Sequence, residues 1–136
     1  MKKQDVDRMT LQEACDYSVS KIVEQGGTCM NSENSCLYKH GDSHCAIGWL
    51  LDEDSDVLMN FKGSVKRLTE NERVSKKLPK LIKENLKEFT LLQYLHDAES
   101  SYRRESMLED LERMGVSTSA HQYQEWVEMG CKANCE

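Results

Sequence analysis

The segment between residues 10 and 27 constrains the fold most, because it carries a helix start, an apolar stripe and a helix stop. Thr10 and Glu13 form a capping box, in which each side chain accepts a hydrogen bond from the other residue's backbone N–H. Gly26 and Gly27 supply the backbone freedom that a left-handed C-cap needs. Apolar and small residues between these ends recur at i, i+3, i+4 spacing: Leu11, Ala14, Cys15, Ser18, Val19, Ile22 and Val23. We therefore predict one amphipathic helix that packs through this stripe.

The next predicted element is a β-hairpin at about residues 36–47. Short segments that mix apolar and polar residues lie on both sides of a turn-forming His-Gly-Asp-Ser stretch. Pairing centred between the His and the Gly of that stretch places Cys36 opposite Cys45, whereas a four-residue loop places Tyr38 there. The sequence leaves both registers open.

Apolar residues at helical spacing predict further helices along the rest of the chain. These are a short helix at 46–51, a turn around Val65 and Leu68, a stretch at 74–95 that Pro79 interrupts or begins, one at 107–114 that Gly115 ends, and a last one with Tyr123, Trp126 and Val127. With 136 residues, the chain is long enough for one hydrophobic core. We predict a mainly α fold with one short hairpin: a single domain over 1–136, with 1–9 and 131–136 as flexible tails.

Charge and hydropathy exclude two classes of partner. The formal net charge is −6, and such a field does not attract a phosphate backbone or an anionic lipid surface. No apolar run approaches the roughly 20 residues that a membrane helix needs. The first residues lack the apolar stretch of a signal peptide, so we expect a cytoplasmic protein that contacts neither nucleic acid nor membrane directly.

Six cysteines are the unusual feature of the composition: Cys15, Cys29, Cys36, Cys45, Cys131 and Cys135. Because the cytosol keeps thiols reduced, we expect buried free thiols rather than disulfides. The alternative is a zinc site formed by Cys29, Cys36, His40 and His44, since thiolate and imidazole ligands suit tetrahedral Zn²⁺. No Cys-x2-Cys pair occurs, and the two histidines fit an exposed polar turn equally well. We therefore expect no cofactor and keep zinc as the alternative.

Catalysis by a thiol is a second alternative. Cys45 begins a predicted helix, where the helix dipole and backbone N–H groups stabilise a thiolate. His96 could act as its general base and Asp97 could orient the imidazole, as in a thiol hydrolase or acyltransferase. In the competing interpretation, Cys45 is a packed core residue while His96 and Asp97 bind backbone groups at a helix end. We favour this structural interpretation because no protease signature surrounds the cysteine.

Several short motifs lie along the chain: Gln25-Gly26, Cys36-Leu37-Tyr38, Cys45-Ala46-Ile47-Gly48, Gln93-Tyr94-Leu95-His96-Asp97 and the helix from Leu108 to Gly115. Together they resemble a family of small proteins of bacteriophages and prophages that has no established activity. The resemblance spans roughly residues 10–116, and the Cys-Ala-Ile-Gly motif is its most specific part. The acidic residues 52–56 and the tail with Cys131 and Cys135 depart from the family pattern. The resemblance implies a phage protein that acts in the cytoplasm of a bacterial host.

On this basis we expect a non-enzymatic protein that binds and modulates or inhibits a host protein, such as a defence or nucleic-acid-processing factor. Asp52, Glu53, Asp54 and Asp56 are the predicted binding residues, because a patterned acidic surface can imitate a phosphate backbone. The competing interpretation is an ordinary solvated surface, since the chain also has 18 lysines and arginines. The sequence leaves a homodimer open and does not identify the host partner.

Overall fold

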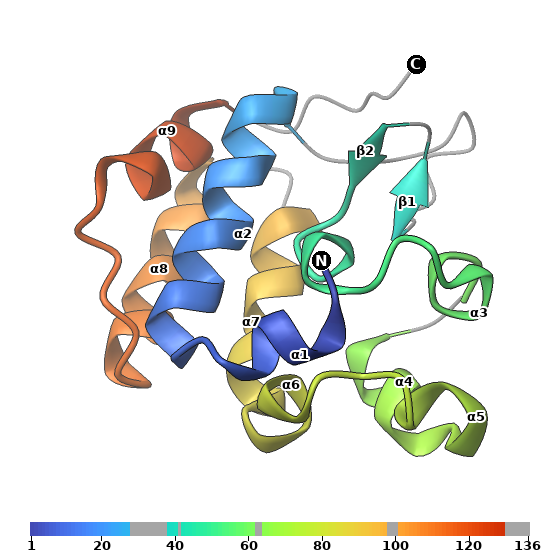
Figure 1. Cartoon of the computed structure of the whole chain (residues 1–136). Helices are drawn as coiled ribbons and strands as arrows, with labels where there is room; N and C mark the ends of the chain where they lie inside the picture. Colours follow the sequence, from blue (N-terminus) through green and yellow to red (C-terminus); the bar gives the residue numbers. More distant parts are fainter. Residues whose placement is uncertain (28–37, 41, 62–63, 98–100, 130–136) are drawn as a thin grey trace.

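A computed structural model describes residues 1–27, 38–40, 42–61, 64–97 and 101–129 (Figure 1). The side chains of residues 39, 40, 96, 97 and 101 lie outside this description. The predicted mainly α fold is confirmed, with short helices and one small hairpin arranged around a shared core. In the described part of the chain, no helix has the length and apolar character needed to cross a membrane.

Helix α2, Leu11–Gln25, forms as predicted from its end signals. The Thr10 hydroxyl accepts a hydrogen bond from the Glu13 backbone N–H at 3.1 Å, and the Thr10 N–H donates to the Glu13 carboxylate at 2.9 Å. Gly26 ends the helix with φ 91°, a left-handed conformation that glycine adopts without steric cost. The buried stripe consists of Ala14, Cys15, Ser18, Val19 and Ile22.

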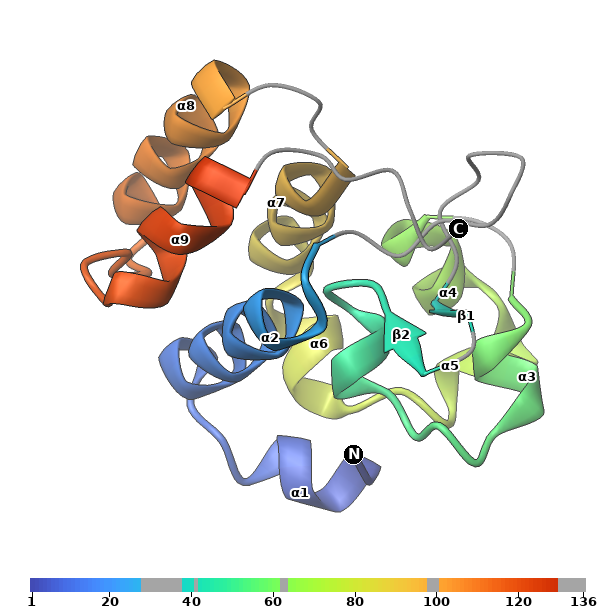
Figure 2. The same cartoon turned by 90° about the horizontal axis from the view of Figure 1, so that it is seen from above.

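Three later helices pack with α2 into the helical part of the molecule: α7 (Leu86–Asp97), α8 (Ser101–Arg113) and α9 (His121–Met129). Helix α9 packs on α2 and on α8, and α8 packs on α7 (Figures 1 and 2). Gly115 follows α8 with φ 95°, and the Val116 N–H donates to the Leu111 carbonyl at 3.0 Å, which is the cap predicted from the sequence. The aromatic residues of α9, Tyr123 and Trp126, are buried in this core.

The hairpin consists of β1 (Lys39–His40) and β2 (Ser43–His44), paired antiparallel. His40 pairs with Ser43, and Lys39 pairs with His44. In this register the next residue pair is Tyr38 and Cys45. The Cys45 N–H donates to the Tyr38 carbonyl at 3.4 Å. Of the two registers left open by the sequence, the structure therefore has the one with Tyr38 opposite Cys45.

Short helices continue the chain after the hairpin. They are the 3-10 helix η1 (Gly48–Leu50) and the α-helices α3 (Asp56–Met59), α4 (Val65–Glu70), α5 (Glu72–Ser75) and α6 (Lys80–Glu84). Side chains of Ser55, Ser64 and Asn71 cap the starts of α3, α4 and α5 by accepting backbone N–H hydrogen bonds. Pro79 precedes α6 directly, so it begins a new helix after α5 has ended.

Residues 1–9 do not form the flexible tail that we expected. They contain α1 (Lys3–Asp7), which packs on α6 and buries Val6 completely. The Asp7 carboxylate accepts a hydrogen bond from the Leu81 N–H at 3.1 Å. A single five-residue helix is unstable by itself, so its stability comes from these distant contacts, which are not visible in the local sequence. Residues 131–136, the other expected tail, lie outside the described residues.

Candidate functional site

The Cys45 thiol, the candidate nucleophile, is inside the protein. Cys45 is 1% exposed, and its Sγ accepts a hydrogen bond from the Gly48 N–H at 3.2 Å. This hydrogen bond lies at the start of η1, where the N-cap residue Ile47 makes no side-chain cap. Burial at this depth keeps a substrate carbonyl from the sulfur atom, so the geometry supports a structural role for Cys45.

Gly48 explains why the chain between the hairpin and η1 takes this path. Its backbone lies against the Tyr38 carbonyl so closely that an added Cβ would overlap the carbonyl oxygen. The His44 Cβ borders the same space at 3.3 Å. Only glycine permits this approach, which holds Tyr38 opposite Cys45 and thereby fixes the register of the hairpin.

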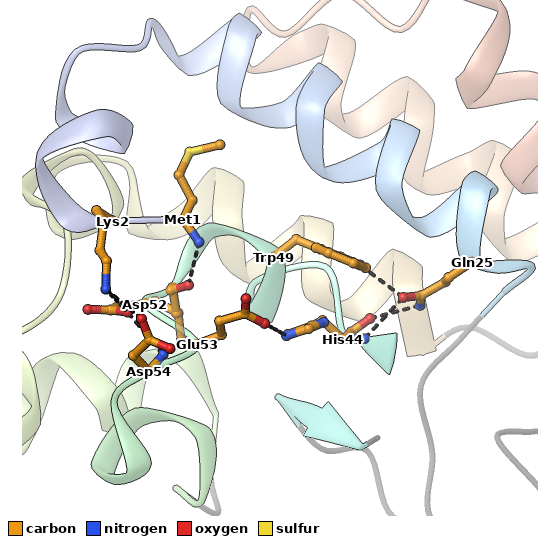
Figure 3. Close-up of polar contacts among 9 residues, drawn as sticks. Met1, Lys2, Gln25, His44, Trp49, Asp52, Glu53 and Asp54 are labelled. Carbon is orange, nitrogen blue, oxygen red and sulfur yellow. Dashed lines mark hydrogen bonds and ion pairs between the residues drawn. The ribbon is translucent and has the colours of Figure 1, made fainter. Parts of the chain in front are cut away.

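Gln25, at the end of α2, joins the helix to the hairpin through both ends of its amide (Figure 3). Its Nε2 donates to the His44 carbonyl at 2.8 Å, and its Oε1 accepts from the His44 N–H at 3.0 Å. The same Oε1 accepts from the Trp49 indole N–H at 3.0 Å. The Lys21 ammonium lies 5.6 Å from the centre of the Trp49 ring, within the range of a cation–π contact.

Two further hydrogen bonds fasten the same region to α2 and α7. The Ser18 hydroxyl donates to the Ala46 carbonyl at 2.5 Å, and the Ile47 N–H donates to the Gln93 Oε1 at 3.3 Å. We call the group Gln25, Tyr38, His44, Cys45, Gly48 and Trp49 the hairpin joint. Of the motif residues of the phage-protein resemblance, Gln25, Tyr38, Cys45 and Gly48 lie in the hairpin joint, and Gln93 binds beside it at the Ile47 N–H. Their polar groups hold the fold together.

His96 and Asp97, the candidate base and its orienting acid, lie at the end of α7. Their side chains are outside the description, so their relation to Cys45 stays a prediction. The other described thiol, Cys15, is buried in the α2 stripe, and this burial raises the pKa of Cys15 to about 12. Cys15 is therefore a protonated core residue at neutral pH.

The zinc prediction falls mostly on residues that the structure does not describe. Cys29 and Cys36 are outside the described residues, and only the backbone of His40 is described. His44 is 3% exposed; its Nε2 lies 3.4 Å from the Glu53 carboxylate, and its ring centre lies 4.3 Å from that of Trp49. In the described ranges, no three His, Cys, Asp or Glu side chains gather as metal ligands. The zinc site stays a prediction.

The predicted acidic binding residues are largely engaged in contacts within the chain (Figure 3). The Lys2 ammonium lies 3.0 Å from the Asp52 carboxylate and 2.8 Å from the Asp54 carboxylate. The hydrogen bond from Lys2 holds the pKa of Asp52 below its usual range, and the bonds to Asp54 and Asp52 raise the pKa of Lys2. Glu53 pairs with His44, while Asp56 is exposed at the start of α3. We call residues 52–56 the acidic segment.

A second charged region, at residues 66–87, was not predicted from the sequence as a binding surface. Residues 66–87 hold eight of the 18 lysines and arginines and only three acids, Glu70, Glu72 and Glu84. We call this stretch the basic region; its cations are Lys66, Arg67, Arg73, Lys76, Lys77, Lys80, Lys83 and Lys87, and all are exposed. They lie on α4, α5, α6 and the start of α7, or, for Lys76 and Lys77, just after α5. These helices lie along the lower side of the molecule in Figure 1. The local excess of cations was the sequence signal that could have found it.

Few charges of the basic region are neutralised within the protein. Among the described residues, the one ion pair of this region joins Lys80 to Glu84 at 3.9 Å. In contrast, Arg104 of α8 is 1% exposed and donates to the Trp126 carbonyl at 3.0 Å. The Arg103-Arg104 pair that appears basic in the sequence therefore presents at most one of its charges at the surface.

Two grooves border these charged regions. One, of about 400 Å³, lies between α3 and α5 and is lined by Asp56, Val57, Asn60, Phe61, Asn71, Arg73 and Val74. The other, of about 600 Å³, is lined by Lys2, Lys3, Gln4, Asp7 and Asp52. Most charged groups of the second groove already bind within the chain, whereas the first combines an apolar wall with the exposed Arg73.

Comparisons with family models, with curated proteins and with solved structures found no match to this chain.

Proposed function

We propose that this chain is a non-enzymatic phage protein that binds a protein of its bacterial host and modulates it in the host cytoplasm. The observation that carries the proposal is the use of the motif side chains. Gln25, Cys45 and Gln93 direct their polar atoms to neighbouring backbone and indole groups. These described motif side chains thus stabilise the fold, and we propose that the exposed charged surface binds the partner.

Catalysis by Cys45 is the runner-up, and the geometry around the sulfur atom does not favour it. A nucleophile must reach the carbonyl that it attacks, and a thiol with 1% exposure does not. A zinc-stabilised interaction module remains compatible with the proposal, since zinc would then support the fold rather than perform a reaction.

Affinity capture from a bacterial lysate, followed by mass spectrometry, tests the proposal. The bait is the full chain, and a Gly48→Ala bait is the matched control because that substitution is expected to disturb the fold. We expect one protein that is recovered in near-stoichiometric amounts by the wild-type bait and is lost with the control. Recovery of no enriched protein, or equal recovery by both baits, contradicts the proposal.

The salt dependence of that capture separates charge from apolar contact. Exposed charges are screened beyond about 8 Å at physiological ionic strength, and beyond about 3 Å in 1 M salt. Release of the partner as salt rises indicates recognition through charge. A partner that stays bound in 1 M salt indicates recognition through apolar contacts.

A further inference from the structure

We infer that the partner presents a segment that is both acidic and apolar, and that this segment docks in the groove between α3 and α5. The inference rests on the proposed function and names the class of partner surface and the place where it binds. Three observations support it: the composition of the groove, the charge of the basic region beside it, and the engagement of Asp52, Glu53 and Asp54 elsewhere.

The groove offers an apolar wall next to a cation. Val57 and Phe61 are partly buried on the α3 side, and Val74 is 3% exposed on the α5 side. Arg73 is exposed at the same groove, in the last turn of α5. The exposed parts of Val57 and Phe61 would contact a leucine or phenylalanine side chain, while the Arg73 guanidinium would pair with a carboxylate in a bidentate manner.

The charge around Arg73 extends the complementarity beyond the groove. Lys76 and Lys77 follow α5 directly, are exposed, and have no ion pair among the described residues. Asp56 supplies one negative charge at the α3 side. A bound segment would therefore place its acidic residues towards α5 and away from α3.

A protein segment fits this region better than a nucleic acid. The basic region has a net charge of +5, so the rest of the chain, with the whole at −6, carries −11. A long phosphate backbone would be repelled by that remainder, whereas a short acidic segment would contact the basic region alone. Glu70, Glu72 and Glu84 also interrupt the cations, which suits a patterned partner rather than a uniform line of phosphates.

A synthetic peptide provides the probe: about 15 residues of glutamate with leucine at i, i+3, i+4, i+7 spacing. Polyglutamate of the same length and a short DNA duplex are the comparison ligands. Binding to the full chain is followed by fluorescence anisotropy, and backbone amide NMR shifts locate the site. We expect the leucine-containing peptide to bind at least about fivefold more tightly than polyglutamate, with shifts at Val57, Phe61 and Val74.

A second exposed arginine provides a comparison variant for this test. Arg73 lies in the four-residue helix α5, whereas Arg113 ends α8 and pairs with Glu109 and Asp110, so the unfolding of both variants is measured beside their binding. We expect Arg73→Glu to weaken peptide binding about tenfold and Arg113→Glu to weaken it less than about twofold. Val57→Thr, which keeps the shape but adds a hydroxyl, should weaken the leucine-containing peptide and leave polyglutamate unchanged.

Three results would overturn the inference: equal losses for both arginine variants, tighter binding of DNA than of peptide, or no amide shifts at the groove with millimolar peptide. Capture from lysate with the wild-type and Arg73→Glu baits distinguishes failure of this inference from failure of the proposed function. If the wild-type bait and the Arg73→Glu bait recover the same partner equally, the partner does not dock in the groove, but the proposed binding of a host protein is supported. If the wild-type bait recovers no partner, the proposed function fails.

Discussion

The acidic segment and the basic region are both conspicuous in the sequence, but the fold treats their charges differently. Lys2 binds Asp52 and Asp54 across about fifty positions of the chain, and His44 lies against Glu53. In the basic region, the described ion pair is the local contact between Lys80 and Glu84. The comparison teaches that net charge alone does not say which sign is available to a partner. This chain is acidic overall, yet among the described residues the exposed cations of the basic region make only one ion pair.

The difference has a cause in the neighbouring structure. The acidic segment follows η1 directly, so it lies next to the hairpin joint and to the α1 residues that dock there. The basic region belongs to short helices that contribute other residues to the core. These buried residues are Val65, Leu68, Val74 and Ile82. The long side chains of the basic region therefore extend into solvent. We expect substitutions near the joint to change stability and substitutions in the basic region to change binding.

The largest effect is expected for Gly48→Ala. The added methyl group would overlap the Tyr38 carbonyl, which is backbone and cannot rotate away. We expect the free energy of unfolding to fall by about 3 kcal/mol, measured by urea denaturation. Ser119→Ala, at an exposed position, is the control and should change stability by less than about 0.5 kcal/mol. A Gly48→Ala protein as stable as this control would mean that the close approach of Gly48 to the Tyr38 carbonyl does not hold the hairpin joint together.

The second largest effect is expected for Gln25→Ala. The substitution leaves the His44 backbone and the Trp49 indole without their amide partner. We expect a loss of about 2 kcal/mol, because part-buried polar groups then lack hydrogen bonds. Gln25→Glu keeps the acceptor and loses the donor, so it should be intermediate. An emission spectrum of Trp49 that does not change in Gln25→Ala would contradict the joint as described.

Substitution of Cys45 should have a medium effect and decides between a structural and a catalytic thiol. Cys45→Ala should cost about 1–3 kcal/mol through a small cavity, and Cys45→Ser should cost more because its hydroxyl is buried. A thiol reagent should label Cys45 slowly at neutral pH, as judged by peptide mass spectrometry. Rapid labelling that is lost in His96→Ala, together with unchanged stability in Cys45→Ala, would instead make this protein an enzyme.

A small effect is expected for Asp52→Asn, and it depends on pH. Lys2 lowers the pKa of Asp52 in the folded state, so this contact contributes stability above the unfolded pKa of about 3.9 and loses it as pH falls through the folded value. Because the pair is largely solvated, we expect a change in melting temperature of about 2 °C or less at pH 7 and a smaller change at pH 2. Asp56→Asn is the matched control. Equal pH profiles for both variants would show that the acidic segment is not held by Lys2.

The smallest effect on stability is expected for the double variant Lys76→Gln and Lys77→Gln. Both side chains are exposed, so we expect a change in unfolding free energy within about 0.5 kcal/mol. The variant should nevertheless lose partner capture at low salt. A large loss of stability would show that the basic region is structural, and would remove the contrast with the acidic segment.

The parts of the fold that sequence predicts well are those decided by neighbouring residues. The capping box of Thr10 and Glu13 and the glycines Gly26 and Gly115 require contacts within a few positions, so their pattern is sufficient. The register of the hairpin was not predictable in this way. It depends on the close approach of Gly48 to Tyr38. It also depends on the hydrogen bonds between His44 and Gln25, which lies at the end of α2.

The site residues follow the same division. The hydrogen bond from the Gly48 N–H to the Cys45 sulfur atom joins residues three positions apart, so it is a local property. That Lys2 neutralises Asp52 and Asp54 is a tertiary property, and neither partner carries a local sign of it. The basic region was visible in the sequence as a local excess of lysine, but averaging the charge over the whole chain concealed it.

The two tryptophans lie in different parts of the protein, so their fluorescence can test whether these parts unfold cooperatively. Trp49 reports on the hairpin joint through its bond to Gln25, while Trp126 is buried in the core between α8 and α9. Replacing one indole by phenylalanine isolates the emission of the other. If both emissions change at the same denaturant concentration as the far-ultraviolet dichroism, the hairpin side and the helical side unfold as one unit. An earlier change at Trp49 would identify the hairpin side as a separately opening part of the native ensemble, and hence as the side that a partner can remodel.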